Sequence, residues 1–488
     1  MSGKFQAWRR AGVLAAVGLI AAAGTAEANA PLTRVSSDPY TNTTSQHATE
    51  VEPDTFADHG TVVSAFQVGR FFDGGSSDIG VVRSGDGGAT WGTPGFLHDT
   101  FNSGSASSPY ERVSDASVAY DRAHGVWIVS SIPILPSGVV PTVLFNRSTD
   151  DGRTWGPAIS MPPPVSNSIS LDKNWTVCDN HPSSPFYGHC YTELDNFGVG
   201  DLELMSTSTD GGSTWSVPIR TDGNDKGLGG QPVVQPSGRV VVPFESLNGT
   251  ISAFHSDNGG ASWSRGLKVS GIRFHGVAGD LRTSPLPTAE VAGDGTIYVA
   301  WEDCRFRKNC PANDIVFSKS ADGVTWTDPA RVPIDPVTSS VDHFIPGLAV
   351  DPATSGAGTH LALTYYFYPD ANCGGACRLE VGYISSPDGG AHWGDARQLA
   401  GPMGLSQIAN TSQGPMTGDY ISTSFSGGMA TTLFPVGRDA TGAAFNEAMY
   451  SPGRLSVATA AQATRLASTT GSFGAVGNGE THHALRDD

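Results

Sequence analysis

The sequence predicts an all-β chain folded as a β-propeller, in which four-stranded antiparallel units surround a common axis. Three observations lead to this prediction. An eight-residue segment that ends in Trp recurs along the chain, short β-rich runs flank its copies, and glycine is frequent (61 of 488 residues) while charged residues make up only 16%. Frequent glycine and few charges are typical of short strands joined by tight turns.

The first thirty residues have the pattern of an export signal. Basic residues near the start are followed by an apolar run over 11–23, and Ala26, Ala28 and Ala30 offer the small residues that signal peptidase recognises. The run is too short for a lasting membrane anchor. We therefore expect a signal peptide at 1–30, a propeller at 31–455, a loosely ordered tail at 456–488 and a secreted (extracellular) product. An N-terminal helix that stays in the membrane is the alternative.

Six copies of the Trp-terminated segment start 48 to 66 residues apart, a spacing typical of one structural unit per repeat. They are Ser84–Trp91, Ser148–Trp155, Ser208–Trp215, Ser256–Trp263, Ser386–Trp393 and the shorter Ser320–Trp326. The Ser and Asp side chains can accept hydrogen bonds from nearby backbone N–H groups, and Gly supplies the positive φ of a reversal. We expect a structural turn in every repeat rather than catalysis or calcium binding by its Asp.

Strand-like runs surround these turns in a constant order. The first unit is predicted at Thr49–Phe56, Thr61–Val68, Asp78–Ser84 and Thr93–Leu97, and the fifth at Thr288–Ala292, Thr296–Trp301, Asp314–Ser320 and Ala330–Ile334. After the sixth copy, Tyr420–Phe425, Thr431–Val436 and Glu447–Tyr450 give three more strands, and a segment near Pro31–Ser37 supplies the fourth. This arrangement favours seven blades, with six as the alternative.

The repeated segment resembles the Asp-box, or bacterial neuraminidase repeat, of the sialidase superfamily, over roughly residues 45–455. The resemblance implies a sialidase-like propeller; relatives of this kind include sialidases, other glycosidases, polysaccharide lyases and proteins with no known chemistry. Sialidases carry an Arg-Ile-Pro motif near the mature N-terminus, and this chain has none. Its nearest string, Arg331-Val-Pro333, falls on a predicted outer strand, so no catalytic residue is transferred from the family.

Charge and cysteine content exclude several partners. The formal net charge of −18 repels nucleic acid and anionic lipid, and we expect a monomer without a cofactor. The six cysteines fall into close pairs in a chain bound for an oxidising compartment, which favours local disulfides over a metal site. The expected bonds are Cys178–Cys190, Cys304–Cys310 and Cys373–Cys377.

Alternating strand direction places the loops between second and third strands, and the connections between units, on the face opposite the Asp-boxes. Loops on a rigid scaffold often carry function, and we expect all three cysteine pairs on this face. Many charged and aromatic residues are also predicted there: Asp73, Arg112, Asp115, Asp172, Lys173, Trp175, Glu193, Asp195, His275, Asp280, Glu302, Arg307, Asp342, Tyr368, Asp419 and Tyr420.

Four arginines from different units are predicted to surround the central opening and bind an anionic or polyhydroxylated sugar, because a guanidinium binds carboxylates in a bidentate manner. They are Arg70, Arg282, Arg305 and Arg438.

Four further residues are the catalytic candidates. Glu245 and Asp303 are the acid–base pair of a glycosidase, which needs two carboxyl groups; His343 and Tyr366 are the proton carriers of a lyase. Motifs of other enzyme classes (G-x-S-x-G, Walker loop, H-E-x-x-H) are missing. The sequence therefore predicts a secreted glycoside hydrolase acting on an extracellular glycan; the alternatives are a non-catalytic glycan- or protein-binding propeller and a polysaccharide lyase.

Overall fold

The computed structural model describes residues 31–440, 442 and 444–463. The predicted signal peptide lies outside this range, as does the tail beyond residue 463. The described chain is built of antiparallel strands with a few single-turn 3₁₀ helices, which confirms the all-β prediction. No helix among the described residues has the length and apolar character needed to cross a membrane.

Most strands belong to sheets of four that follow one another along the chain. The first three sheets, in strand order, are β2 (Glu50–Asp58), β3 (Thr61–Arg70), β4 (Ser76–Ser84) and β5 (Gly95–Phe96); β6 (Arg112–Asp121), β7 (Val126–Ile134), β8 (Leu144–Ser148) and β9 (Ile159–Ser160); β10 (Leu171–Cys178), β11 (Cys190–Asn196), β12 (Leu202–Ser208) and β13 (Ile219–Arg220). A single residue pair, Ser76 with Val113, connects the first two.

The fourth sheet has a divided first strand, β14 (Gly227–Leu228) and β15 (Val233–Val234), followed by β16 (Val240–Ser246), β17 (Thr250–Ser256) and β18 (Leu267–Gly271). The fifth and sixth sheets are β19 (Thr288–Val291), β20 (Ile297–Asp303), β21 (Asp314–Ser320) and β22 (Ala330–Arg331); β23 (Asp342–Val350), β24 (Leu361–Tyr368), β25 (Arg378–Ser386) and β26 (Arg397–Gly404). A small hairpin, β27 (Ala409–Thr411) and β28 (Gly414–Met416), precedes the last sheet.

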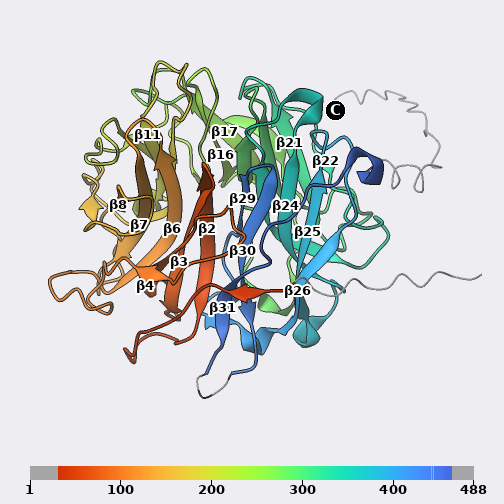
Figure 1. Cartoon of the computed structure of the whole chain (residues 1–488), viewed down its shortest axis with the longest axis horizontal. Helices are drawn as coiled ribbons and strands as arrows, with labels where there is room; N and C mark the ends of the chain where they lie inside the picture. The colour runs from red at the N-terminus through yellow and green to blue at the C-terminus, as the bar shows by residue number, and fades with distance from the viewer. Residues whose placement is uncertain (1–30, 441, 443, 464–488) are drawn as a thin grey trace, which may run out of the picture.

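The last sheet joins the two ends of the described chain. β29 (Ser422–Ser426), β30 (Met429–Gly437) and β31 (Glu447–Ser451) pair in order, and the N-terminal strand β1 (Thr33–Arg34) pairs with β31. The predicted fourth strand from the N-terminus is thus confirmed. Figure 1 shows the red β2 and the blue β29 and β30 side by side, although they are far apart in sequence.

The first strands of successive sheets lie against one another. β2 contacts β6, β6 contacts β10, and the series continues through β15, β19, β23 and β29 back to β2. Each gap between neighbouring sheets holds its own apolar layer, such as Val63 and Ile79 against Val118 and Trp127 between the first two sheets. Every sheet therefore buries both faces, and each added sheet extends the core.

The six predicted turns connect the third and fourth strands of their sheets. In the third sheet the Ser208 hydroxyl donates to Asp210 at 2.9 Å and accepts from the Gly212 N–H at 2.9 Å, while the Thr214 N–H and hydroxyl donate to Asp210 at 2.9 and 2.7 Å. The closing Trp215 stacks on Phe145 of the preceding sheet at 3.8 Å. Corresponding side-chain bonds occur at Asp86, Asp150, Asp322 and Asp388.

All three predicted disulfides are present. Their placement corrects one expectation. Cys178 ends the first strand of its sheet and Cys190 begins the second, so this bond lies on the Asp-box face rather than the opposite one. The Cys304–Cys310 and Cys373–Cys377 bonds close loops between second and third strands, as expected.

We predict that Asp210→Ala lowers stability without affecting ligand binding. The substitution removes acceptors for three hydrogen bonds at a largely exposed turn, so we expect a loss of about 1–2 kcal/mol. Thermal unfolding and ligand titration measure the two effects. Asp222→Ala, an exposed aspartate outside the turn, is the control. Loss of binding at unchanged stability would contradict a structural role.

Candidate functional site

A cavity of about 210 Å³ runs between the first strands and is lined by residues from every sheet in the series. Its walls include Asp54 from β2, Val118 from β6, Thr176 from β10, Gln231 beside β15 and Ser422 from β29. At one end the lining becomes charged and aromatic. Asp115, Lys173, Trp175, Asp419 and Tyr420 meet there.

Three neighbouring first strands contain the same kind of β-bulge near this end of the cavity. Their pairing with the second strand shifts register at Glu52 in β2, Asp115 in β6 and Lys173 in β10. Each of these residues has a positive φ, at 54°, 51° and 51°. Left-handed backbone is uncommon for residues other than glycine, and bulges near functional sites redirect side chains. A fourth strand, β23, has the same shift at Ile345, which is apolar.

The redirected side chains form one network of opposite charges. The Lys173 ammonium donates to Asp419 and also to Asp115, at 3.4 Å. Arg282 adds a bidentate contact to Asp419, with its Nε 2.7 Å from Oδ1. We call Glu52, Asp115, Lys173, Arg282, Asp419 and Tyr420 the central cluster. Its members come from five separate stretches of the chain.

Glu52 lies behind the charged groups and is fully buried. Its carboxyl accepts from the Asp419 N–H at 3.0 Å and from the side chain of Gln67. Gln67 also donates to Ser114 at 3.1 Å and accepts from Arg70 at 3.2 Å. This polar layer fixes the backbone of Asp419 and holds Arg70 close to the cluster.

The surroundings of Glu52 and Asp419 shift the pKa values of these two carboxyl groups in opposite directions. Burial, with the negative charges of Asp115 and Asp419, raises the pKa of Glu52 to about 7. Burial alone would raise the pKa of Asp419 as well, but Arg282 and Lys173 hold it below its usual range. The pKa of Lys173 shifts upward, because its acidic neighbours outweigh the effect of burial. The cluster thus contains one carboxyl that keeps its proton up to about neutral pH and one that is ionised well below it.

Two aromatic rings complete this end of the cavity. Trp175 and Tyr420 meet edge to face, with ring centroids 5.1 Å apart, and the Tyr420 hydroxyl points to the Ala116 carbonyl at 3.4 Å. Rings beside charged hydrogen-bonding groups suit a ligand with apolar C–H faces and many hydroxyls.

The four predicted arginines do not form one ring. Arg282 belongs to the central cluster. Arg70 is buried beside the cluster, close enough to interact electrostatically with Arg282 and Asp419. Arg305 is held in its own loop by Asp303, and Arg438 is exposed, with its guanidinium 4.7 Å from the centre of the Tyr450 ring. The structure therefore brings together two of the four.

The predicted catalytic residues are not brought together either, and none lines the cavity. Glu245 is half-buried beside Ser284, and Asp303 is fully buried against Arg305. His343 and Tyr366 occupy neighbouring strands but opposite faces of the sixth sheet: His343 contacts Tyr365, whereas the buried Tyr366 hydroxyl donates to the Pro435 carbonyl at 2.8 Å.

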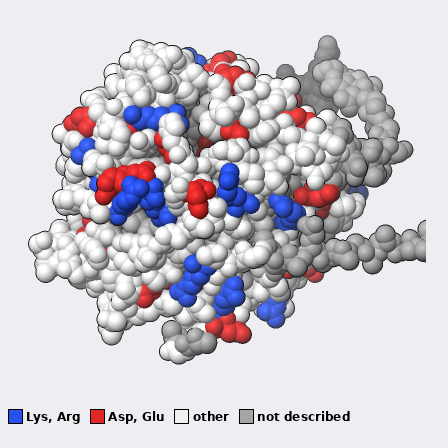
Figure 2. Space-filling view, in the orientation of Figure 1, with Lys and Arg blue, Asp and Glu red and all other residues white. Residues whose placement is uncertain are grey.

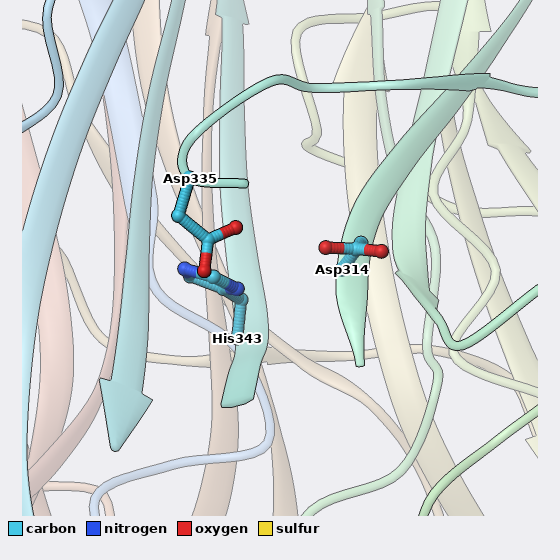
Figure 3. Close-up of side chains that lie close together, drawn as sticks. All are labelled: Asp314, Asp335 and His343. Carbon is cyan, nitrogen blue, oxygen red and sulfur yellow. The ribbon is translucent and has the colours of Figure 1, made fainter. Parts of the chain in front are cut away.

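His343 also belongs to a group with Asp314 and Asp335 that has the residue types of a metal site (Figure 3). Two arginines already form ion pairs with both aspartates. Arg307 lies 2.7 Å from Asp314 and 3.0 Å from Asp335, and Arg331 lies 2.7 and 2.5 Å from the same two groups. Burial lowers the pKa of His343 to about 4. This arrangement is a buried ion-pair network rather than a metal centre.

Sequence reasoning placed Asp115, Lys173, Asp419 and Tyr420 on the correct face but did not select them, and it missed Glu52 as a site residue. Glu52 lies within a strand-like run and is followed by Pro53, and a proline inside a strand is a signal of a bulge or a sheet edge that was not used to select it. Figure 2 shows basic and acidic side chains close together on a face that is otherwise largely uncharged.

No family model and no curated protein sequence matches this chain. Among solved structures it is similar to a Dyadobacter fermentans protein of unknown function, with 17% identity over 73% of this chain and 99% of that one and a TM-score of 0.46. A Hadza microbial sialidase has 16% identity over 84% of this chain and 66% of that one, with a TM-score of 0.41. An ulvan lyase has 9% identity over 89% of this chain and 99% of that one, with a TM-score of 0.49. At these scores we draw no argument from them.

The shifted pKa of Glu52 predicts how stability depends on pH. A carboxyl with a higher pKa in the folded state binds its proton more tightly there, so its ionisation destabilises the fold as pH rises from about 4.5 to about 7. Glu52→Gln cannot ionise. We therefore expect the variant to gain stability relative to the native protein between pH 5 and pH 8.

Urea unfolding of both proteins at the two pH values measures this difference. Asp395→Asn, at an exposed position away from the cavity, is the control for loss of one charge. An equal stability difference at pH 5 and pH 8 would show that Glu52 is already ionised at the lower value.

Proposed function

We propose that this chain is an exported, sialidase-like propeller of seven blades that hydrolyses an extracellular glycan at the central cluster. The contacts of first strands in a series that returns to its start support the blade count, and the disulfides fit an oxidising destination. The cavity between the first strands then follows the propeller axis, with the cluster at one mouth.

One observation carries the functional part of the proposal. Three adjacent first strands each depart from regular pairing at a charged residue, Glu52, Asp115 or Lys173. Left-handed backbone outside glycine costs free energy, and such positions concentrate at functional sites. The same bulge in β23 carries the apolar Ile345, so the charged side chains at the other three bulges, rather than the bulges themselves, are what supports a polar ligand at this end of the cavity.

The chemistry of glycoside hydrolysis fits these groups. Cleavage needs a carboxyl that holds a proton and a carboxylate that acts as base or nucleophile. In the proposed arrangement Glu52 stores the proton and Asp115, which lines the cavity, faces the sugar.

Lys173 and Arg282 would donate to sugar hydroxyl or carboxylate oxygens, since both side chains are partly exposed, at 10% and 21%. The Trp175 and Tyr420 rings would contact the C–H face of the same sugar. These contacts favour a glycan over an apolar ligand.

A binding propeller without catalysis is the second candidate, and two observations favour it. Glu52 does not line the cavity, and Asp419 is already paired with two cations. If no proton path leads from Glu52 to the ligand, the cluster would bind a sugar without cleaving it.

We predict that Asp115→Asn abolishes turnover while largely preserving binding. Purified protein is incubated with neutral, sialylated and uronate-containing glycans, and both reducing-sugar release and binding heat are measured. Losing a carboxylate that acts in the transition state should reduce the rate by about 10²–10⁴-fold. Lys173→Met should weaken binding itself, and Asp395→Asn is the control.

Three outcomes are distinguishable. Hydrolysis that depends on Asp115 supports the hydrolase, and binding that depends on Lys173 without hydrolysis supports the second candidate. Neither binding nor release with any glycan would overturn both.

A further inference from the structure

Three large apolar side chains are exposed on neighbouring loops of the face that carries the central cluster. Leu247, between β16 and β17, is 54% exposed; Phe274, after β18, is 37% exposed; and Phe306, between β20 and β21, is 40% exposed. Scattered single apolar residues are ordinary on a protein surface, whereas adjoining ones indicate contact with a ligand or partner.

Hydrogen bonds between these loops show that they adjoin. The Ile272 N–H donates to the Gly249 carbonyl at 3.0 Å, and the Cys304 N–H donates to the Arg273 carbonyl at 2.7 Å. Arg305 strengthens the junction by donating to Ser270 at 2.9 Å while it is paired with Asp303. The Cys304–Cys310 disulfide closes the third loop. The exposed side chains thus project from a fixed surface.

Three exposed cations lie near the apolar residues in the sequence. Lys268, Arg273 and Lys308 are exposed, and none has an ion pair among the described residues. The Lys268 ammonium lies 3.7 Å from the position that a Cβ on Gly271 would occupy, so its side chain extends toward these loops. No Asp or Glu in the stretches 245–249, 266–276 and 302–310 is exposed. In a chain of net charge −18, this is a locally basic surface.

The connection between β18 and β19 links this surface to the central cluster. Phe274 lies near its start and Arg282, which pairs with Asp419, lies eight residues later. Between Arg282 and β19, Ser284 contacts Glu245 at 3.4 Å, at the end of the strand that leads to Leu247. A ligand that extends from the cluster along this connection would reach the exposed apolar side chains.

We propose that Leu247, Lys268, Arg273, Phe274, Phe306 and Lys308, here called the loop patch, bind additional sugar residues of an anionic polysaccharide whose leading residue occupies the central cluster. The inference rests on the proposed function, since it assumes a glycan at that cluster. Carboxylate or sulfate groups pair with the three cations, and the C–H faces of the sugar rings pack on the two phenylalanines. The substrate is therefore an acidic polymer rather than a single terminal sugar.

A polymer fits this surface better than a folded protein does. A stable protein interface buries about 800 Å² on each partner, with a large apolar centre. The loop patch offers only three exposed apolar side chains, with exposed cations near them in the sequence, on the face that carries the central cluster. So few apolar groups among cations suit a narrow anionic chain better than a protein surface.

The test measures affinity against chain length. Galacturonic acid, its trimer and its hexamer, heparin fragments of matching lengths and neutral dextran oligosaccharides are titrated by calorimetry at low and high salt. We expect the anionic hexamer to bind at least tenfold more tightly than the monomer, with an advantage that decreases as salt rises, because surface ion pairs are screened.

Two paired substitutions then assign this advantage to the loop patch. Phe274→Ala with Phe306→Ala, and Arg273→Glu with Lys308→Glu, should each reduce hexamer affinity to that of the monomer and leave monomer affinity unchanged. Arg265→Glu and Tyr187→Ala, at exposed positions on the Asp-box face, are the matched controls. Retention of the length advantage in both pairs overturns the proposal, as does failure of both anionic hexamers to bind.

The outcomes also separate this inference from the proposed function. A length advantage lost in the patch variants, without any hydrolysis, leaves the loop patch standing and the hydrolase refuted. Hydrolysis of short glycans with no affinity advantage for longer chains supports the hydrolase and refutes the loop patch. If polyglutamate binds through the patch and the anionic hexamers do not, the partner is an acidic protein and the polysaccharide assignment is wrong.

Discussion

The requirement that every sheet bury both of its faces determines most of this structure. A four-stranded sheet packed on one side only would expose an apolar face, so each sheet needs two neighbours. The series of sheets meets this requirement by returning to its start, where Val35 and Phe66 from the N-terminal part pack against Leu433 and Met449. Pairing of β1 with β31 secures the junction. The cavity between the first strands and the polar groups at its end exist only because the series returns in this way.

The central cluster lies where the first strands of three sheets depart from regular pairing with their second strands. The bulges at Glu52, Asp115 and Lys173 occur at the same step of neighbouring first strands, so one local irregularity, repeated, brings three polar side chains into the same cluster. Bringing charges out of water is unfavourable unless they are paired and hydrogen-bonded. Asp419 provides the pairing, because it accepts from both Lys173 and Arg282, and its backbone is held by Glu52. Removing Lys173 or Arg282 would leave Asp419 with one cation fewer, and removing Asp419 would leave both cations without this carboxylate.

Local sequence patterns predicted the strands well, because turn chemistry and strand periodicity act over a few residues. β21 has the predicted bounds, Asp314–Ser320, and β3 extends the predicted Thr61–Val68 by two residues. The candidate catalytic residues lie apart for a different reason. His343 and Tyr366 looked equivalent as loop-side polar residues, yet strand alternation directs them to opposite faces of one sheet, where each is buried. A loop assignment fixes the face of the molecule and leaves the direction of each side chain undetermined.

The sequence by itself determined the all-β class, the repeated turns, the strand order and the three disulfides, since each depends on residues close together in the chain or on a repeated pattern. Only the tertiary structure decided which charged residues meet. Glu52, Lys173, Arg282 and Asp419 are separated by more than a hundred residues at each step, and their convergence depends on bulge positions in three strands and on how the ring of sheets is completed. A bulge inserts a single residue into a strand and redirects a side chain. Pro53 marks the irregular pairing at Glu52, but no local pattern specifies which distant residues the redirected side chain will meet.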